Sequence, residues 1–561
     1  MAGKRAWDEP EEVPKPHLPP GPASLEEVLR FLDAPLSSLE SKVGKERFKG
    51  FLKNMASGMV ITESYAGTGA MSTAAATLFD LVRKRWPEHV AGGSPVVTYA
   101  ATEMLGHAQM VLEKHKGMSR PLHRFENILG RISPVDLDTA RRIEQEALSQ
   151  FKAHEDAYKV GCISKADLFD FRAELGKELV EKLRHLMERI EFKTTDYCLE
   201  HGMQCPITPR ASTDPLHRSM MWVEGAGSTC CPFSRQNRSL QGKWLNTATL
   251  PLMVWLYSTR YYGPDKILHE CVGGFDNDLL KQVFCNKQDD EGGDHGHCLD
   301  PIPTCPFARV CPKCCDTLAT VERKYQMKSQ IFSPVNLGIP TGRRRRYTAL
   351  DLIPVAAQDL EKEPGPTFES LFYRNMEVSC SIYMAASESQ VKEFLSERVH
   401  ATAQKLGYVP GGDTDYEKTL TCGEYTRLQG HRLNLCRQHK VLPKVALTCL
   451  DQNPEWMKSS FTKQTPTLLR KSTLYDMISQ RPLLPLEYFL IQGYPHPDTG
   501  IISEELRAQF PFADALSILA PHEVTSLMGN GMHLAQAGTW LLWNMVPGLA
   551  DASSDAAALD P

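Results

Sequence analysis

Short apolar runs alternate with longer mixed segments near the start of the chain. Residues 59–62 and 95–101 are apolar runs rich in Val, Ile and Thr, and each is followed by a mixed segment, 71–84 and 105–115. Short apolar runs bounded by turn residues are typical of buried strands, whereas longer periodic segments are typical of helices. The order strand, helix, strand, helix predicts an α/β domain with a parallel sheet.

A second pattern begins at Ser164, where Asp167 follows three residues later, as at the N-terminus of many helices. This spacing and the pattern beyond it predict a long amphipathic helix. We therefore expect a helical insertion within residues 133–220 that buries one face against the rest of the protein. Its apolar positions, three and four residues apart, are Leu168, Phe171, Leu175, Leu179, Leu183, Leu186 and Ile190.

The two ends of the chain differ in composition from the rest. Residues 1–23 are rich in Pro and charged residues, and residues 548–561 are rich in Ala, Asp and Ser. Segments with so little apolar surface cannot compensate the entropy lost on ordering, so we expect both to be disordered. Ser24 and Glu27 have the spacing of a capping box and predict a helix start that packs onto the first domain.

Composition and charge narrow the class of protein. With 561 residues, of which 42% are apolar, the chain can bury a large core and exceeds one ordinary domain. The formal net charge of -5 gives no overall attraction to a polyanion, so nucleic-acid contact requires a locally basic cleft. Sixteen cysteines without an apolar signal segment favour a reducing compartment. Since no apolar run approaches membrane-span length, we expect a soluble protein without membrane contact.

The first predicted strand leads into a glycine-containing loop. Gly67 and Gly69 allow a tight turn that brings backbone amides at a helix N-terminus close to a ligand. Ser72 takes the place of the third glycine of the dinucleotide fingerprint, which disfavours a nicotinamide cofactor. Glu103, after the second predicted strand, is placed to accept hydrogen bonds from ribose hydroxyls.

Two further segments carry more specific chemistry. Residues 227–234 (GSTCCPFS) place two cysteines before a proline, and residues 267–272 (ILHECV) contain a glutamate after an apolar run. Here the chain resembles the cytosine-5 methyltransferase family, in which a Pro-Cys-Gln-x-Phe-Ser loop holds the nucleophile and a Glu-Asn-Val segment engages the base. Cys230 and Glu270 stand at the matching positions.

Five more segments resemble the family in its order along the chain. Residues 63–69 (ESYAGTG) are similar to Asp-Leu-Phe-x-Gly-x-Gly, and residues 125–128 (FENI) to Phe-Gly-Asp-Ile. Residues 338–345 (GIPTGRRR) are similar to Gly-Val-Pro followed by Gln-x-Arg-x-Arg. Residues 481–495 resemble the segment that supports the recognition region, and residues 529–532 (GNGM) the final Gly-Asn-Ser-Val. Seven such segments in one order are hard to obtain by chance.

The resemblance implies a Rossmann-like methyltransferase domain that uses S-adenosyl-L-methionine, beside a smaller target-recognition domain. It implies that the Cys230 thiolate adds to carbon 6 of cytosine while the Glu270 carboxyl group hydrogen-bonds ring nitrogen 3. Arg345, and less directly Arg343, would orient that carboxyl group. The implied cofactor-binding residues are Tyr65, Ala66, Gly67, Thr68, Gly69, Glu103, Met104, Asn127, Ile128, Thr229 and Asn530.

Several positions depart from the family pattern. The nucleophile, the carboxylate and both arginines are retained, so an active enzyme is the favoured interpretation and a catalytically impaired one the alternative. Cys231 beside Cys230 leaves a second assignment of the reactive thiol open, and we assign Cys230. The departures are Thr229 for proline, Cys231 for glutamine, Cys271 for asparagine, Thr341 for glutamine and Asn127 for aspartate.

The resemblance also divides the chain. Residues 24–347 would form the catalytic domain, 348–480 the recognition domain, and 481–547 a segment that returns to the catalytic domain. A Cys/His-rich insertion at 285–318 joins the helical one at 133–220 as a departure from the family. Its cysteine spacing fits a zinc site, and an exposed loop without metal is the alternative. The candidate ligands are Cys298, Cys305, Cys311 and Cys314.

We expect the enzyme to methylate cytosine in DNA, with the target base extruded from the stack. An RNA (tRNA) cytosine-5 methyltransferase is the nearest alternative, and a catalytically impaired nucleic-acid-binding protein of the same fold is the other. A DNA substrate predicts residence in the nucleus, with the cytoplasm as the alternative. We expect a monomer.

Overall fold

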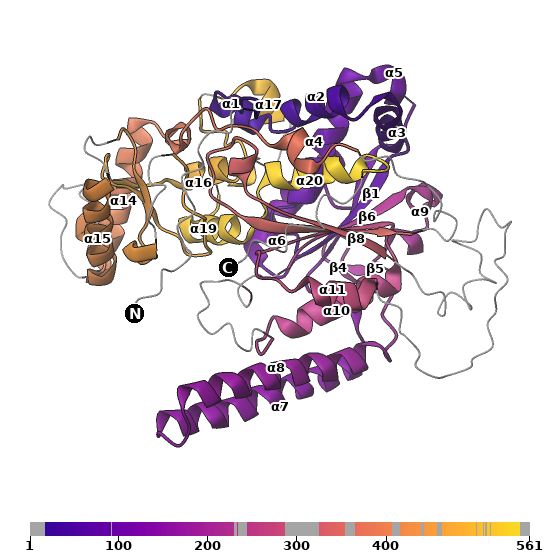
Figure 1. Cartoon of the computed structure of the whole chain (residues 1–561), viewed down its shortest axis with the longest axis horizontal. Coiled ribbons are helices and arrows are strands. Elements are labelled where there is room, and N and C mark those ends of the chain that lie inside the picture. Colours follow the sequence, from indigo (N-terminus) through magenta and orange to yellow (C-terminus); the bar gives the residue numbers. More distant parts are fainter. Residues whose placement is uncertain are drawn as a thin grey trace.

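The computed structural model describes residues 17–90, 92–228, 233, 244–285, 325–353, 365–406, 416–438, 443–456, 463–500, 502–508, 510, 513–516 and 518–549. Its central feature is a seven-stranded sheet (Figure 1). The strands of this sheet are β1 Met59–Ser64, β2 Val96–Thr102, β3 His123–Phe125, β6 Met221–Gly227, β7 Lys266–Cys271, β8 Tyr325–Phe332 and β9 Arg345–Leu352.

The strand order is β3-β2-β1-β6-β7-β9-β8. The strands β3, β2, β1, β6 and β7 run parallel to one another, and β9 is antiparallel to both β7 and β8. The first five strands repeat the order 3-2-1-4-5 of doubly wound sheets, and the last two extend that sheet as an antiparallel pair. The predicted α/β fold is confirmed. In such a sheet the ligand crevice lies at the carboxyl ends of the strands where the order reverses, here between β1 and β6.

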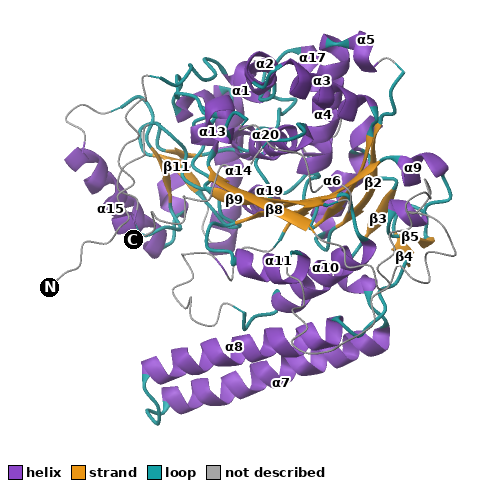
Figure 2. Cartoon of the chain, turned by 45° about the vertical axis from the view of Figure 1, so that its right-hand side comes forward, coloured by secondary structure: helices purple, strands orange, loops and turns teal. Residues whose placement is uncertain are grey.

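Helices cover both faces of the sheet (Figures 1 and 2). The face drawn uppermost carries α3, α4 and α20, and the opposite face carries α10 and α11. Every residue of α20 is buried, so this C-terminal helix completes the core that the N-terminal helices begin. The helices of these layers are α1 Leu25–Leu29, α2 Asp33–Lys42, α3 Lys45–Ala56, α4 Ala70–Arg85, α5 Pro87–Val90, α6 Gly106–Lys114, α9 Pro215–Ser219, α10 Thr249–Tyr262, α11 Asn277–Phe284, α13 Phe368–Phe372 and α20 Leu534–Met545.

The helical insertion is a hairpin of two long helices, α7 Pro134–Lys159 and α8 Lys165–Met187, which extends beyond the body of the molecule (Figure 2). The capping box of Ser164 and Asp167 is present. Small Ala140 and Ala147 on α7 share a core with the leucine stripe of α8 and with α10. The hairpin is therefore joined to the sheet through α10. A short antiparallel pair follows it, β4 Thr195–Cys198 and β5 Met203–Pro206.

A smaller unit lies to one side of the sheet. It has a separate apolar core that contains Tyr416, Leu428 and Tyr475. A three-stranded antiparallel sheet and two helices surround this core. Its elements and those that connect it back to the large sheet are α14 Glu388–Leu406, α15 Cys422–Gln438, β10 Leu447–Cys449, β11 Leu474–Asp476, β12 Arg481–Pro482, α16 Pro485–Ile491, α17 Glu504–Ala508, α18 Ala513–Leu516 and α19 Pro521–Asn530.

Three boundaries differ from the sequence prediction. Strand β9 continues to Leu352, and α13 packs into the large core, so that core extends past residue 347. At the N-terminus, the backbone of Gly21 donates to Asn375 and Asn375 donates to Pro19, both within 2.9 Å, so residues 19–21 are ordered by pairing rather than by apolar burial. At the C-terminus, Leu549 is buried, although residues 548–561 were expected to be disordered. Among the described residues, no helix has both the length and the apolarity to cross a membrane.

Candidate active site

The loop after β1 turns sharply into α4. Tyr65, Gly67 and Gly69 have positive φ angles of 56°, 56° and 74°. Positive φ is uncommon for a residue with a side chain, and backbone strain of this kind clusters at ligand sites. A Cβ atom placed on Gly67 would meet nothing within 4 Å, so the loop borders open space. The predicted glycine loop is present and is accessible to a ligand.

Glu103, directly after β2, faces this loop. One carboxylate oxygen, Oε1, accepts from the backbone N–H groups of Met104 and Leu105 at 2.9 Å, and Oε2 accepts from that of Gly67 at 2.8 Å. A carboxylate offers about four acceptor positions, so one on Oε2 remains for a hydroxyl donor. Met104 is 67% exposed beside it. This set of groups fits the ribose of a nucleoside cofactor.

Asn127 and Ile128 begin the short helix η2, Ile128–Arg131, after β3. The Asn127 side-chain oxygen accepts from the backbone N–H of Leu129 at 3.0 Å and so caps η2. This cap fixes the amide beside the end of β3 and uses its oxygen, whereas the NH₂ group is the donor that an adenine ring nitrogen needs. Ile128 is buried in the apolar core that also contains residues of α10 and α11.

Glu270 lies near the end of β7 and is 4% exposed. Its Oε1 is 3.1 Å from Nε of Arg345, at the start of β9. This ion pair is not aligned as a hydrogen bond, and Oε1 accepts no hydrogen bond from the described residues. A buried carboxylate oxygen is stabilised by a hydrogen-bond donor, so Oε1 is available to a donor group of a ligand. Arg345 is also buried, so the charge pair is shielded from solvent.

The guanidinium of Arg343 donates to the carbonyl oxygens of Gly529, at 3.4 Å, and Gly531, at 2.5 Å. Arg343 positions the 529–532 segment, in which Asn530 is exposed at the end of α19.

The 529–532 segment connects the predicted cofactor loop with Glu270. A Cβ atom on Gly531 would lie 4.0 Å from Thr68 Oγ1, and Thr68 Oγ1 is 2.9 Å from the Tyr494 hydroxyl. A Cβ atom on Gly227, at the end of β6, would lie 3.0 Å from Met532 and 3.7 Å from Glu270 Oε2. Segments far apart in sequence thus meet at the carboxyl ends of β1, β6 and β7.

Thr229 and Cys230 lie outside the described residues, as do Cys298, Cys305, Cys311 and Cys314. The residues that flank the predicted nucleophile loop are described. Ser228 Oγ is 2.8 Å from Nε2 of His269 on β7. Beyond the loop, the ring of Phe233 packs edge-on against Phe275, with centroids 4.9 Å apart. Both flanks of the loop are therefore anchored beside the strand that carries Glu270.

Two of the positions that depart from the family pattern, Cys271 and Thr341, have structural explanations. Burial raises the pKa of Cys271 to about 12, so its thiol stays protonated and does not compete as a nucleophile. Thr341 Oγ1 is 2.9 Å from the Tyr383 hydroxyl and donates to the Ile491 carbonyl oxygen at 3.1 Å. The hydroxyl group of Thr341 is therefore used to join the Arg343 segment to α16.

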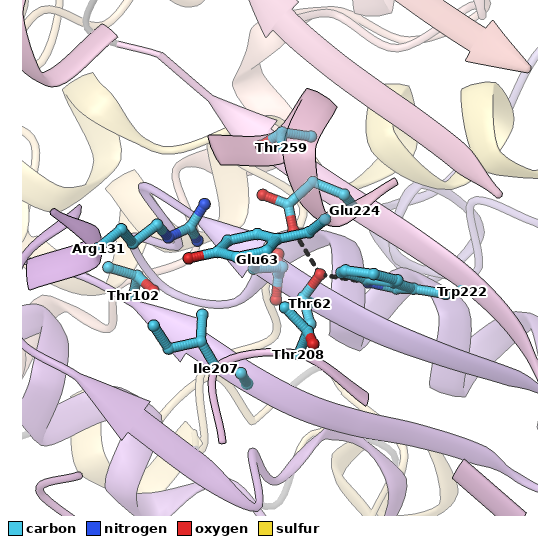
Figure 3. A pocket seen from close by; sticks show the side chains of 11 residues that line it. Thr62, Glu63, Thr102, Arg131, Ile207, Thr208, Trp222, Glu224 and Thr259 are labelled. Carbon is cyan, nitrogen blue, oxygen red and sulfur yellow. Dashed lines mark hydrogen bonds between the residues drawn. The ribbon is translucent and has the colours of Figure 1, made fainter. Parts of the chain in front are cut away.

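A buried polar cavity under β1 and β6 was not anticipated from the sequence (Figure 3). Glu224 Oε1 accepts from Ser64 at 2.5 Å and from the indole of Trp255 at 3.1 Å, and Thr62 donates to Oε2. Arg131 donates to Ser64 Oγ at 2.8 Å. The one sequence signal was a glutamate inside an otherwise apolar strand. These contacts join β1, which leads into the glycine loop, to β6, which leads into residues 227–234.

A groove of about 430 Å³ lies between the smaller unit and the large sheet. Three basic side chains line it, those of Arg398, Arg470 and Lys471, together with His107 and one carboxylate. The groove adjoins the candidate site, because a Cβ atom on Gly529 would meet the backbone of Arg470 at 2.3 Å. It supplies the local positive charge that the net charge of the chain does not.

No family profile matches the chain, and no curated protein matches it. Solved structures resemble it at low identity. Entamoeba histolytica methyltransferase EhMeth is 12% identical, with 87% of this chain and 98% of that chain covered and a TM-score of 0.33. A variant of Spodoptera frugiperda DNMT2 is 11% identical, with 87% and 99% covered and a TM-score of 0.32. S. pombe Dnmt2 methyltransferase is 11% identical, with 87% and 98% covered and a TM-score of 0.32.

The strand order, five parallel strands with an antiparallel pair at one end, is that of a Rossmann-like α/β fold. The likeness to these solved structures concerns the fold.

Proposed function

We propose that the chain is an S-adenosyl-L-methionine-dependent methyltransferase that modifies carbon 5 of cytosine in DNA. The observation that carries the proposal is the buried Glu270 carboxylate, with one oxygen that accepts no hydrogen bond from the described residues, beside Arg345 at the sheet's ligand edge. A carboxyl group so placed can hydrogen-bond ring nitrogen 3 of an extruded pyrimidine.

The residues around the glycine loop fit the cofactor. Glu103 retains an acceptor position for a ribose hydroxyl, Asn127 can donate to adenine, and the loop at Gly67 borders open space. S-adenosyl-L-methionine, when bound, supplies an electrophilic methyl group. Thr68 and Asn530 would flank it, because the 529–532 segment lies beside the loop.

The chemistry assigned to the protein's own groups is addition and elimination. The thiolate of Cys230 forms a bond to carbon 6 of cytosine, and the Glu270 carboxyl group stabilises or protonates nitrogen 3 as electrons move into the ring. Carbon 5 then becomes nucleophilic enough to accept the methyl group. In the elimination that follows, a base takes the proton from carbon 5 while the sulfur–carbon bond breaks, which restores the aromatic ring and releases the Cys230 thiolate. Arg345 holds the Glu270 side chain in place through its ion pair.

The basic groove supports a nucleic-acid substrate. Its arginines and lysine can contact phosphates, which fix the register of a duplex but do not read its sequence. The thiolate reaches carbon 6 and the methyl donor reaches carbon 5 from outside the ring plane, so the target base must leave the stack. Because a DNA substrate is proposed, residence in the nucleus is proposed with it.

The direct test is incubation of the full chain with labelled S-adenosyl-L-methionine and matched panels of DNA and RNA, followed by mapping of the modified base. We expect 5-methylcytosine in DNA and none with the Cys230→Ser variant, while Cys231→Ser retains activity. Label confined to RNA would transfer the proposal to RNA, and label at another atom or on no nucleic acid would contradict it.

A further inference from the structure

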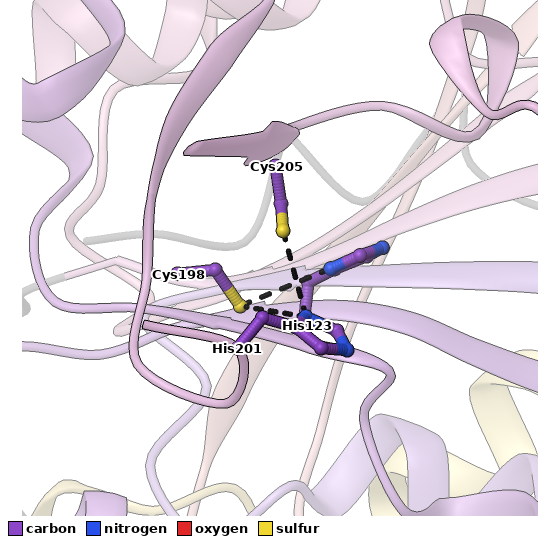
Figure 4. A group of neighbouring side chains, drawn as sticks. All are labelled: His123, Cys198, His201 and Cys205. Carbon is purple, nitrogen blue, oxygen red and sulfur yellow. Dashed lines mark hydrogen bonds between the residues drawn. The ribbon is translucent and has the colours of Figure 1, made fainter. Parts of the chain in front are cut away.

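A cluster of metal-ligating side chains lies away from the candidate active site, at the β3 edge of the sheet (Figure 4). Its members are His123 on β3 and Cys198, His201 and Cys205 on the β4–β5 hairpin. One ligand atom from each lies within 4.8 Å of the others. None of these residues belongs to the Cys/His-rich insertion that the sequence singled out.

The distances within the cluster match those of a tetrahedral metal site. Cys198 Sγ lies 3.8 Å from Nδ1 of His123 and 3.4 Å from Nδ1 of His201, and Cys205 Sγ lies 3.5 Å from the latter atom. Zinc bonds of about 2.3 Å to sulfur and about 2.0 Å to nitrogen, at tetrahedral angles, separate sulfur from nitrogen by about 3.6 Å. The side chains are thus arranged around a common centre.

The hairpin itself explains why a metal would be needed. Its strands have four residues each, and a two-stranded pair of this length is marginally stable alone. Tyr197 and Met203 point outward, 53% and 61% exposed, so their side chains add little apolar burial. Gly202, with a φ of +64°, closes the turn between the ligands. A metal would fix this turn to the sheet edge.

Burial also separates this cluster from an incidental group of surface residues. Cys198 is fully buried and Cys205 is 6% exposed, in a small core that contains Tyr99 and Phe125. The ring of Tyr99 packs against that of His123, with centroids 4.9 Å apart. The backbone N–H of Leu199 donates to the Arg124 carbonyl at 2.8 Å, so the hairpin is held beside β3 independently of the ligands. The ligand set is therefore held in place by its surroundings.

We propose that His123, Cys198, His201 and Cys205 form a structural zinc site that fastens the β4–β5 hairpin to the edge strand β3. Two thiolates and two imidazoles complete a closed tetrahedral set with no open position for substrate, so the metal would stabilise the fold rather than react. The hairpin follows α8, so the site would also anchor the end of the helical insertion and cover an edge of the sheet.

The test measures zinc per chain in the full-length protein purified without chelator. The double variant Cys198→Ser/Cys205→Ser should lose one equivalent relative to the unsubstituted chain, and the exposed ligand variant His201→Gln should lower zinc affinity. Cys422→Ser, at an exposed cysteine elsewhere, should retain all the zinc. Unchanged zinc content in the double variant would overturn the proposal.

A second measurement leaves the four proposed ligands unchanged. Serine at Cys298, Cys305, Cys311 and Cys314 removes the other cysteine cluster as a source of zinc. X-ray absorption at the zinc edge in that background should show two sulfur and two nitrogen neighbours. Absence of zinc there, or a disulfide between Cys198 and Cys205 in the freshly purified chain, would contradict the site.

Discussion

The charge pair of Glu270 and Arg345 is the feature on which the proposed chemistry depends at the scale of single residues. Glu270→Gln keeps the shape but removes the acidic proton and the negative charge. We expect the methyl-transfer rate of the folded variant to fall by about 10²- to 10⁴-fold, the range that positioned proton transfer contributes. Steady-state kinetics on DNA would measure the fall.

A matched control is Glu417→Gln, since Glu417 pairs with Arg432 at 2.9 Å in the smaller unit. Its rate should remain near that of the unsubstituted chain. Equal rates for Glu270→Gln and the unsubstituted chain would remove Glu270 from the mechanism.

Burial raises the pKa of Glu63, beneath the glycine loop, to about 7. The folded chain therefore binds this proton more tightly than the unfolded chain, whose carboxyl titrates near 4.5. It follows that this group's contribution to stability is present below about pH 4.5, declines as the pH rises to about 7 and is then constant. Glu63→Gln should remove a decline of at most about 3 kcal/mol over that window. Denaturant unfolding across the window measures it, and parallel curves for the two proteins would contradict the assignment.

Sequence motifs located several chemical groups but not their partners. The resemblance identified Glu270 and Arg345, and the structure pairs them. It also identified Arg343, with a less direct role, and the side chain of Arg343 donates to the carbonyl oxygens of Gly529 and Gly531. The donors to Glu224 could not be found from the sequence, because Ser64 and Trp255 come from segments whose proximity only the folded sheet creates.

At the scale of elements, α19 and the 529–532 segment are fitted closely against residues 469–470. A Cβ atom on Gly529 would lie 2.2 Å from the Leu469 backbone. Gly529→Ala therefore forces backbone to move, at a typical cost of about 1–3 kcal/mol, and should displace the segment that Arg343 holds. We expect a lower melting temperature together with a lower rate.

Gly423→Ala on α15 is the matched control, since its added methyl group would meet only the guanidinium of Arg427, at 3.5 Å or more. Alanine favours helices over glycine, so this variant should be as stable as the unsubstituted chain or more so. A Gly529→Ala variant with unchanged stability and rate would show that the fit is looser than described.

Elements with a clear apolar pattern were predictable from the sequence, and elements without such a pattern were not. The pattern gave α8 with its capping box and gave β1, β2, α4 and α6 to within two residues. The β4–β5 hairpin has four-residue strands and largely exposed side chains, so it carries no apolar alternation to detect. Helix α7 buries alanines rather than a leucine stripe, which weakens its periodic signal.

At the scale of the whole molecule, the groove between the smaller unit and the sheet should be an electrostatic contact surface. If Arg470 and Lys471 each neutralise a phosphate, Arg470→Gln/Lys471→Gln should reduce the slope of log affinity against log salt by about 2. Lys177→Gln/Lys182→Gln on the exposed face of α8 is the control and should leave the slope unchanged. Fluorescence anisotropy with duplex DNA measures both, and equal slopes for the two variants would place the nucleic acid elsewhere.

The order of segments along the chain predicts the order of its domains, but it does not predict where one domain ends and the next begins. Phe368 and Phe372 join the large core, although the sequence placed them in the recognition domain. Their apolar character is visible in the sequence, but the core they enter is decided by α2 and α20, which come from opposite ends of the chain.

The most direct test of the central claim is covalent trapping on duplex DNA that contains 5-fluorocytosine, in the presence of S-adenosyl-L-methionine. Fluorine at carbon 5 cannot leave as a proton does, so the sulfur–carbon bond should persist, and mass spectrometry should find DNA attached to Cys230. No adduct, or an adduct that forms equally well in Cys230→Ser, would contradict the account.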